Sequence, residues 1–114
     1  MITFTEADIK DIKVGMTESF TKTITDVDVK MYAELSGDVN PVHIDEDYAK
    51  KSRFGRKIAH GLFSAGFFSA IFGTKLPGTG CVYVSQNLNF KRPVYIDDMV
   101  VATVTVLEVD QKSK

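Results

Sequence analysis

An aspartate and a histidine lie five residues apart in Asp38-Val-Asn40-Pro41-Val-His43. A carboxylate accepts protons and hydrogen bonds, and an imidazole gives or takes a proton near neutral pH. Because Pro41 disfavours helical backbone at Asn40 and lacks an N–H, we expect an ordered loop here rather than part of a helix. In such a loop the two side chains could hold one water molecule and deprotonate it. The alternative is that Asp38 only caps a turn and His43 packs at the surface.

A second feature is His60-Gly61, at the start of the apolar stretch from Gly61 to Phe72. The stretch has no polar face, which predicts a helix buried on nearly all sides. Unpaired N–H groups and the positive end of the helix dipole lie at such a start, where they can stabilise a carbonyl oxygen that gains negative charge. The alternative is that Gly61 eases a tight turn and His60 caps the helix. Ser64 and Ser69, inside the helix, are each expected to bond back to their own backbone.

Two further helices must position the loop. The first is predicted from Thr25 to Gly37, with Thr25 and Asp28 as a capping box and glycine as the terminator. Val27, Met31 and Leu35 recur every four residues in it, which predicts its apolar face. The second is a short polar helix, Glu46 to Lys51, with Asp45 as its cap.

Strand-like patterns precede and follow these helices. They occupy Glu18 to Ile24, Cys81 to Phe90 and Met99 to Val109, with a turn at Ile96 to Asp98. Both alternating sets of residues in the last segment are largely apolar, so we expect that strand to be covered on both faces. One long buried helix with strands before and after predicts an α+β fold, in which an antiparallel sheet curls around the helix.

The composition is that of one ordinary globular domain. Of the 114 residues, 44% are hydrophobic and 25% charged, and the net charge is -1 without a basic block, which argues against nucleic acid as a partner. The lone cysteine, Cys81, makes no internal disulfide or zinc site and fits a reducing compartment. The first ten residues do not resemble a signal peptide, and the apolar stretch is shorter than the roughly 20 residues of a membrane span. We expect a soluble cytoplasmic protein.

Taken together, the motifs resemble those of the MaoC-like dehydratases, and most of all the (R)-specific enoyl-CoA hydratases of polyhydroxyalkanoate supply. The matching segments are Ser36-Gly-Asp38-Val-Asn40-Pro41-Val-His43-Ile-Asp45, Ile58-Ala-His60-Gly61-Leu, Leu76-Pro-Gly-x-Gly80 and Phe90-Lys-Arg-Pro93-Val. They keep the family's order and spacing, and the resemblance covers about residues 10 to 109.

This resemblance implies a hot-dog fold that pairs into a homodimer, and an enzyme of fatty-acid metabolism. The implied reaction is the reversible hydration of trans-2-enoyl-CoA to (R)-3-hydroxyacyl-CoA, with no metal or redox cofactor. By position, Asp38 and His43 match the catalytic pair, and Gly61 matches the glycine whose N–H holds the thioester oxygen. Asn40 and Ser69 match supporting positions of the active site.

CoA or acyl carrier protein would then carry the acyl group. Five basic side chains are expected to contact its phosphates, and for each of them the alternative is a solvated surface position. They are Arg53, Arg56, Lys57, Lys91 and Arg92. Phe63, Phe67 and Phe68 are candidates for lining the acyl tunnel.

Two other functions remain open from the sequence. One is an acyl-CoA thioesterase of the same fold, and the other is a non-catalytic acyl-thioester binding module. Members of the family continue for about two more strands beyond the turn-like end, Asp110-Gln-Lys-Ser-Lys114. We therefore expect residues 1–114 to be a single domain in a C-terminally shortened form.

Overall fold

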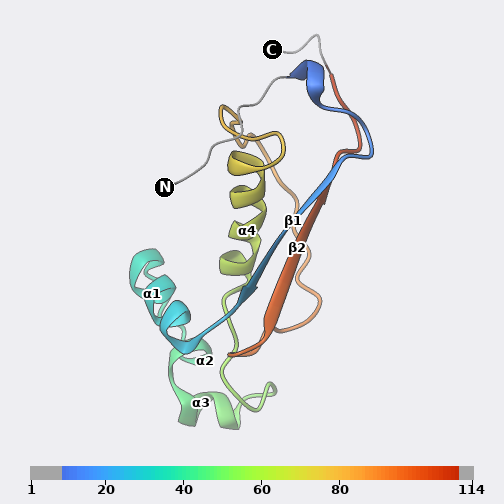
Figure 1. Ribbon diagram of the computed structural model, residues 1–114. Coiled ribbons are helices and arrows are strands. Elements are labelled where there is room, and N and C mark those ends of the chain that lie inside the picture. Colours follow the sequence, from blue (N-terminus) through green and yellow to red (C-terminus); the bar gives the residue numbers. More distant parts are fainter. Residues whose placement is uncertain (1–8, 111–114) are drawn as a thin grey trace. The chain divides into compact units, whose positions relative to one another are not determined.

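A computed structural model of the chain describes residues 9–110 (Figure 1). The elements, in chain order, are η1 (Ile9–Asp11), β1 (Thr17–Thr23), α1 (Asp26–Ser36), α2 (Pro41–Ile44), α3 (Glu46–Lys51), α4 (Gly61–Thr74) and β2 (Met99–Thr105). The chain divides into two compact units. The first contains Gly66–Gln86 with the flanking segments up to Phe20 and from Val101, and the second contains Thr21–Ala65 with Asn87–Val100.

The helix α1 begins and ends as predicted. Asp28 N–H donates to the Thr25 hydroxyl at 3.1 Å, and Thr25 N–H donates back to the Asp28 carboxylate at 3.0 Å, which completes the capping box. Gly37 terminates the helix with φ of 80°, a left-handed conformation that glycine adopts without steric cost.

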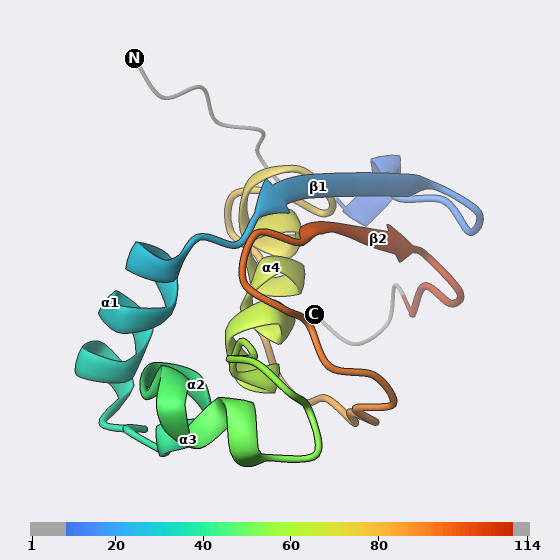
Figure 2. The same ribbon diagram turned by 90° about the horizontal axis from the view of Figure 1, so that it is seen from below.

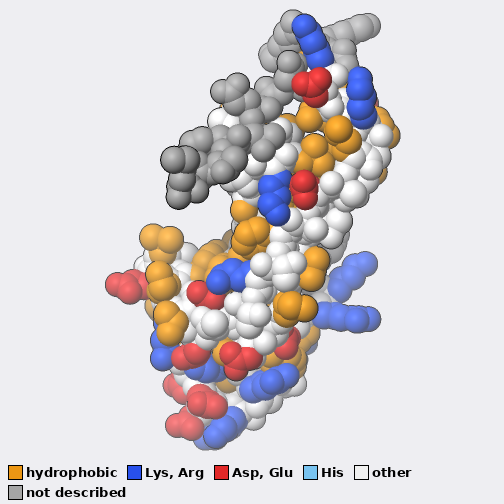
Figure 3. Space-filling model, in the orientation of Figure 1, with side chains coloured by type: hydrophobic (Ala, Val, Ile, Leu, Met, Phe, Trp, Pro, Cys, Tyr) orange, Lys and Arg blue, Asp and Glu red, His pale blue; other side chains and the backbone are white. Residues whose placement is uncertain are grey.

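The buried face of α1 differs from the prediction. Val29 and Ala33 are the buried residues of the helix, with Val29 fully buried. The expected apolar face is exposed instead: Val27 and Met31 are 63% exposed and Leu35 is 90% exposed. Figure 3 shows this apolar stripe along α1. Periodicity identifies a stripe, but it does not say which side of a helix the rest of the chain covers.

The expected loop from Asp38 to His43 is shorter than predicted. Pro41 is the first residue of α2, so His43 lies in a helical turn. The prediction was wrong here because proline is tolerated at the first helical position, where its missing N–H would have no intrahelical partner anyway. The next helix, α3, has the predicted bounds, and the Asp45 side chain accepts from Tyr48 N–H at 3.1 Å.

The strands β1 and β2 form a two-stranded sheet (Figure 1). Gly15 N–H donates to Val106 O at 2.8 Å, and Ile24 N–H donates to Asp98 O at 2.9 Å, so residue numbers rise along one strand as they fall along the other. The sheet is therefore antiparallel, and the two arrows point in opposite directions in Figure 2.

Two strand predictions need correction. The segment Cys81 to Phe90 forms no strand within the described residues, and Val82 and Val84 are 79% and 90% exposed. An extended segment becomes a strand only where a neighbour accepts its backbone hydrogen bonds, and residues 9–110 supply none here. The final strand ends at Thr105 and is not covered on both faces, because Met99 and Val101 are 67% and 57% exposed.

In the first unit the end of α4 packs against β1. The Phe20 and Phe67 rings lie 5.4 Å apart, and Ile71 is fully buried. The helix runs two residues beyond the predicted end, to Thr74, and the expected turn follows, where Gly78 N–H donates to Phe72 O at 2.9 Å.

The expectation that α4 is buried on nearly all sides is wrong for the described chain. Leu62 is 58% exposed, and Ser69 is also exposed. Two strands offer too little surface to cover every side of so apolar a helix.

Within residues 9–110, no helix is long and apolar enough to cross a membrane. The predictions about the first eight residues and about the turn-like end from 111 to 114 lie outside the described residues.

We expect Thr25→Ala to lower the free energy of unfolding by about 1 kcal/mol, because one N–H at the start of α1 loses its acceptor. Urea denaturation followed by circular dichroism measures the change. Thr25→Ser keeps the hydroxyl and is the matched control, so an equal loss in both variants would contradict the capping role.

Candidate active site

The Asp38 carboxylate is held in the loop between α1 and α2. Its backbone N–H donates to Ser36 Oγ at 3.1 Å, and its Oδ1 accepts from Asn40 N–H at 3.2 Å. The turn-capping alternative for Asp38 is thus observed, but among residues 9–110 it engages one carboxylate oxygen through one short-range bond. The second carboxylate oxygen is available for a proton or a ligand.

Asn40 positions the helical turn that carries the predicted histidine. Its side chain caps α2 by accepting from Val42 N–H at 3.3 Å. Its supporting role is therefore local, through the backbone of α2.

His43 is buried, at 8% exposure, which contradicts the alternative of surface packing. Its Nδ1 lies 2.7 Å from Ile58 O. Because a carbonyl oxygen can only accept, Nδ1 must carry the hydrogen, and in the neutral ring Nε2 is then a bare lone pair. The geometry therefore leaves His43 with one nitrogen that can take a proton.

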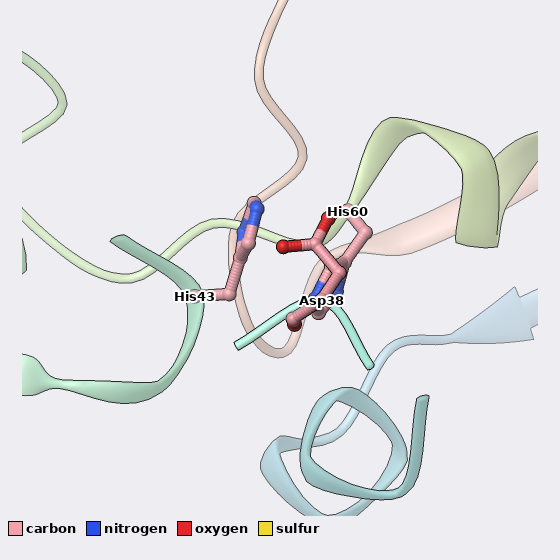
Figure 4. A group of neighbouring side chains, drawn as sticks. All are labelled: Asp38, His43 and His60. Atoms are coloured by element: carbon pink, nitrogen blue, oxygen red, sulfur yellow. The ribbon is translucent and has the colours of Figure 1, made fainter. Parts of the chain in front are cut away.

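His60 belongs to the same cluster, although the sequence indicated only a possible cap. It is 2% exposed, and its Nε2 donates to the backbone oxygen of Asp38 at 2.9 Å. Its ring stacks on the His43 ring with centroids 3.9 Å apart and contacts the Tyr32 ring at 4.7 Å. Figure 4 shows Asp38, His43 and His60 gathered at this point. The only sequence signal was the position of His60 beside Gly61.

A cavity of about 410 Å³ lies against this cluster. Its walls include Asp38, His43, His60, Gly61, Ser64 and Phe90. All of these residues belong to the second unit. The structure thus brings the predicted Asp38, His43 and Gly61 to one concave site, which is the usual form of a small-molecule site.

Gly61 is the first residue of α4 and lies directly under an aromatic ring. A Cβ atom built at this position would lie 2.8 Å from Cε1 and 2.9 Å from Cδ1 of Phe90, closer than carbon atoms approach. Phe90 is otherwise largely open to solvent, at 62% exposure. Any side chain at position 61 would therefore displace Phe90 into the cavity or away from it.

The five basic candidates separate into three groups. Arg53, Lys91 and Arg92 line the cavity. Arg56 stacks on the Tyr95 ring, 3.9 Å from its centroid. Lys57 forms an ion pair with Asp26 at 2.5 Å, and this hydrogen bond is the first cause of the lowered pKa of Asp26. Of the five, only the first group lines this cavity, while Lys57 has a structural role.

Other predicted residues lie elsewhere. Phe63 stacks on Tyr32 at 5.0 Å, and Phe67 packs on Phe20, so neither lines the cavity. Leu62, which the sequence did not single out, does line it. Ser69 lies in the first unit, where it is exposed, and its supporting role stays a prediction.

Burial keeps the His43 imidazole in its neutral form. Desolvation lowers its pKa below the ordinary value of 6.5, and the nearby His60 ring acts in the same direction. The Ile58 carbonyl and the Asp38 carboxylate oppose this shift of the pKa. At neutral pH the site therefore combines a neutral base with a carboxylate that can stabilise the imidazolium once the base is protonated.

The same three side chains offer ligand atoms within 4.8 Å of one another, as a metal site would. His43 Nδ1 and His60 Nε2 are already bonded to backbone carbonyls, so the ring nitrogens left for a ligand are His43 Nε2 and His60 Nδ1. That the site works without a metal stays a prediction.

Solved structures share this fold. The chain superposes on an (R)-hydratase from A. caviae involved in PHA biosynthesis with a TM-score of 0.87 and 37% identity, over 90% of this chain and 77% of the other. This likeness confirms the α+β hot-dog fold that the sequence resemblance implied.

Curated relatives are also close in sequence. The chain is 55% identical to an (R)-specific enoyl-CoA hydratase of Rhodospirillum rubrum, over 85% of this chain and 67% of the relative. It is 50% identical to a 3-hydroxybutyryl-CoA dehydratase of Methylorubrum extorquens, over 87% of this chain and 63% of the relative. The chain thus spans about two thirds of the length of these relatives. Residues 10–114 match the family described as MaoC like domain, and the chain belongs to this MaoC-like dehydratase family.

Proposed function

We propose that this chain carries a reversible hydro-lyase activity, which adds water to trans-2-enoyl-CoA and gives (R)-3-hydroxyacyl-CoA. The observation that carries the proposal is the cavity that joins the Asp38 carboxylate, the bare Nε2 of His43 and the start of α4. The names of the relatives at 55% and 50% identity support the same reaction.

The first part of the mechanism is activation of water. Asp38 and His43 hold one water molecule between them, and Nε2 of His43 takes one of its protons while the oxygen bonds to C3 of the enoyl group. The Asp38 carboxylate stabilises the imidazolium that forms. The C2–C3 π electrons move toward the thioester and give an enolate. The imidazolium then returns its proton to C2, and the reverse sequence is dehydration.

The second part is stabilisation of the enolate oxygen. Gly61 is the first residue of α4, where N–H groups have no intrahelical acceptor and the dipole is positive. Its N–H donates to the thioester oxygen, and one such donor typically lowers the barrier by about 3 kcal/mol.

The carrier of the acyl group binds at the basic part of the cavity wall. We expect Arg53, Lys91 and Arg92, which line the cavity, to contact its phosphates. Both CoA and acyl carrier protein present a phosphate next to the pantetheine arm, so this contact accommodates either carrier. The homodimer and the cytoplasmic location stay predictions.

Asp38→Asn and His43→Gln are each expected to lower turnover of crotonyl-CoA at least about 100-fold, because the first removes the charge that stabilises the imidazolium and the second removes the base that takes the proton from water. Loss of the ultraviolet absorbance of the enoyl thioester measures the rate, and circular dichroism checks that both variants fold. Near-normal rates in both would contradict the assignment. Release of free thiol would indicate a thioesterase, and acyl-CoA binding without any product would indicate a binding module.

The pH dependence follows from the neutral state of His43. Its pKa is lowered, so the ring stays unprotonated down to more acidic pH than an exposed histidine does. We expect kcat/KM for crotonyl-CoA to remain above half its maximum at pH 6.5 and to fall only at lower pH. A half-maximum at or above this pH would mean that His43 is not the base, or that its pKa is not lowered.

The contact between Gly61 and Phe90 predicts a compensating pair. Gly61→Ala keeps the N–H, but its methyl group pushes the Phe90 ring from its place, and we expect kcat/KM to fall about tenfold or more. The double variant Gly61→Ala with Phe90→Ala should regain most of this loss, because the obstructing ring is gone. If the loss of kcat/KM in the double variant equals the sum, in free energy, of the losses in the two single variants, the methyl group itself blocks the substrate. Phe90→Ala alone is the control.

A further inference from the structure

The Ser64 hydroxyl is buried without a hydrogen-bond partner. Its Oγ finds no donor or acceptor among the described residues, although serine in a helix was expected to bond back to its own backbone. A buried polar group in this state is costly, and such groups commonly mark a place that water or a ligand completes. Ser64 lines the cavity that contains Asp38, His43 and Gly61.

The position of Ser64 on α4 relates it to Gly61. Residues three apart in a helix are neighbours on one face, and helical side chains tilt toward the N-terminus. The Ser64 side chain therefore leans toward the first turn of α4, and Ser64 and Gly61 both line the same cavity.

The enolate oxygen can use both donors. An oxygen that carries negative charge accepts more than one hydrogen bond, and Gly61 provides a single backbone N–H. A serine hydroxyl rotates about its Cβ–Oγ bond, so it can donate to an oxygen that forms only during the reaction.

We infer that Ser64 is a further catalytic residue, whose hydroxyl donates a second hydrogen bond to the thioester oxygen beside the Gly61 N–H. The inference rests on the proposed hydratase function and adds to it a side chain that the sequence motifs do not indicate. It also gives the unpaired hydroxyl a partner when substrate is bound.

A structural alternative is available within the chain. His60 Nδ1 is also buried and has no partner in the described part of the chain, and His60 lies four residues before Ser64. Since His60 Nε2 donates to the Asp38 carbonyl, Nδ1 of the neutral ring can only accept. If the Ser64 hydroxyl only donated to His60 Nδ1, it would hold the imidazole ring in place and would not stabilise negative charge on the substrate. Measurements of charge stabilisation therefore separate the two roles.

The first experiment compares Ser64→Ala and Ser64→Cys with the unchanged chain, using crotonyl-CoA. We expect Ser64→Ala to lower kcat about 10- to 100-fold with KM changed less than about twofold, because the bond forms mainly in the transition state. The thiol of Ser64→Cys is a weaker donor of similar shape, so its kcat should lie between that of the unchanged chain and that of Ser64→Ala. Thr79→Val is the matched control: it also removes a buried hydroxyl without a partner, but Thr79 does not line the cavity. Its kcat should be unchanged.

The second experiment measures the enolate directly. Acetoacetyl-CoA ionises to an enolate with its own ultraviolet band, and a site with two donors should increase that band on binding. Ser64→Ala should reduce the increase, while Thr79→Val should not.

The outcomes distinguish the inference from the proposed function. An unchanged kcat and an unchanged enolate band in Ser64→Ala would overturn the role of Ser64 and leave the hydratase proposal intact. If the chain without substitutions is folded but neither hydrates crotonyl-CoA nor strengthens the enolate band, both the role of Ser64 and the hydratase proposal are overturned. If Ser64→Ala fails to fold, the Ser64→Cys variant decides by the same two measurements.

Discussion

The hydrogen bond from His60 Nε2 to the backbone oxygen of Asp38 ties the residue before α4 to the loop after α1. The distance between the Asp38 carboxylate and the start of α4 depends on this bond, which joins residues 22 positions apart in the chain. The bond from His43 Nδ1 to Ile58 O joins α2 to the same strip of backbone. Each imidazole is thus held by a hydrogen bond to a backbone carbonyl, and because the two rings stack, the two hydrogen-bonded segments lie next to each other. Backbone acceptors have no protonation state of their own near neutral pH, so they hold both tautomers constant.

This anchoring accounts for the division of chemistry in the site. Each histidine uses one nitrogen for structure and keeps the other unprotonated in its neutral form. The unprotonated nitrogen of His43 lines the cavity side of the cluster in the proposed mechanism, whereas that of His60 is buried and has no partner within residues 9–110. Burial lowers the pKa of His43 and so favours its neutral form. The site gains a base at neutral pH at the cost of keeping polar atoms away from water.

The helix start supplies the complementary charge. The cavity has bases on the α1–α2 side and hydrogen-bond donors at α4, which suits a reaction in which a proton leaves water while negative charge builds on a carbonyl oxygen. Phe90 covers Gly61 from a segment without regular structure, so the size of the cavity depends on a ring held by few neighbours.

Local patterns alone predicted α1, α3 and the start of α4, but not α2, and they singled out Asp38, His43 and Gly61 as candidates. Capping residues, glycine terminators and an Asn-Pro pair act within a few residues of themselves, so their effects can be recognised without the fold. Tertiary structure decided which side of α1 is buried, that Cys81 to Phe90 lacks a strand partner within residues 9–110, and that Ser64 lacks a hydrogen-bond partner. It also decided that His60 is part of the site and that Lys57 pairs with Asp26. These features depend on contacts between residues far apart in the chain, and periodicity carries no information about which distant surface a side chain meets.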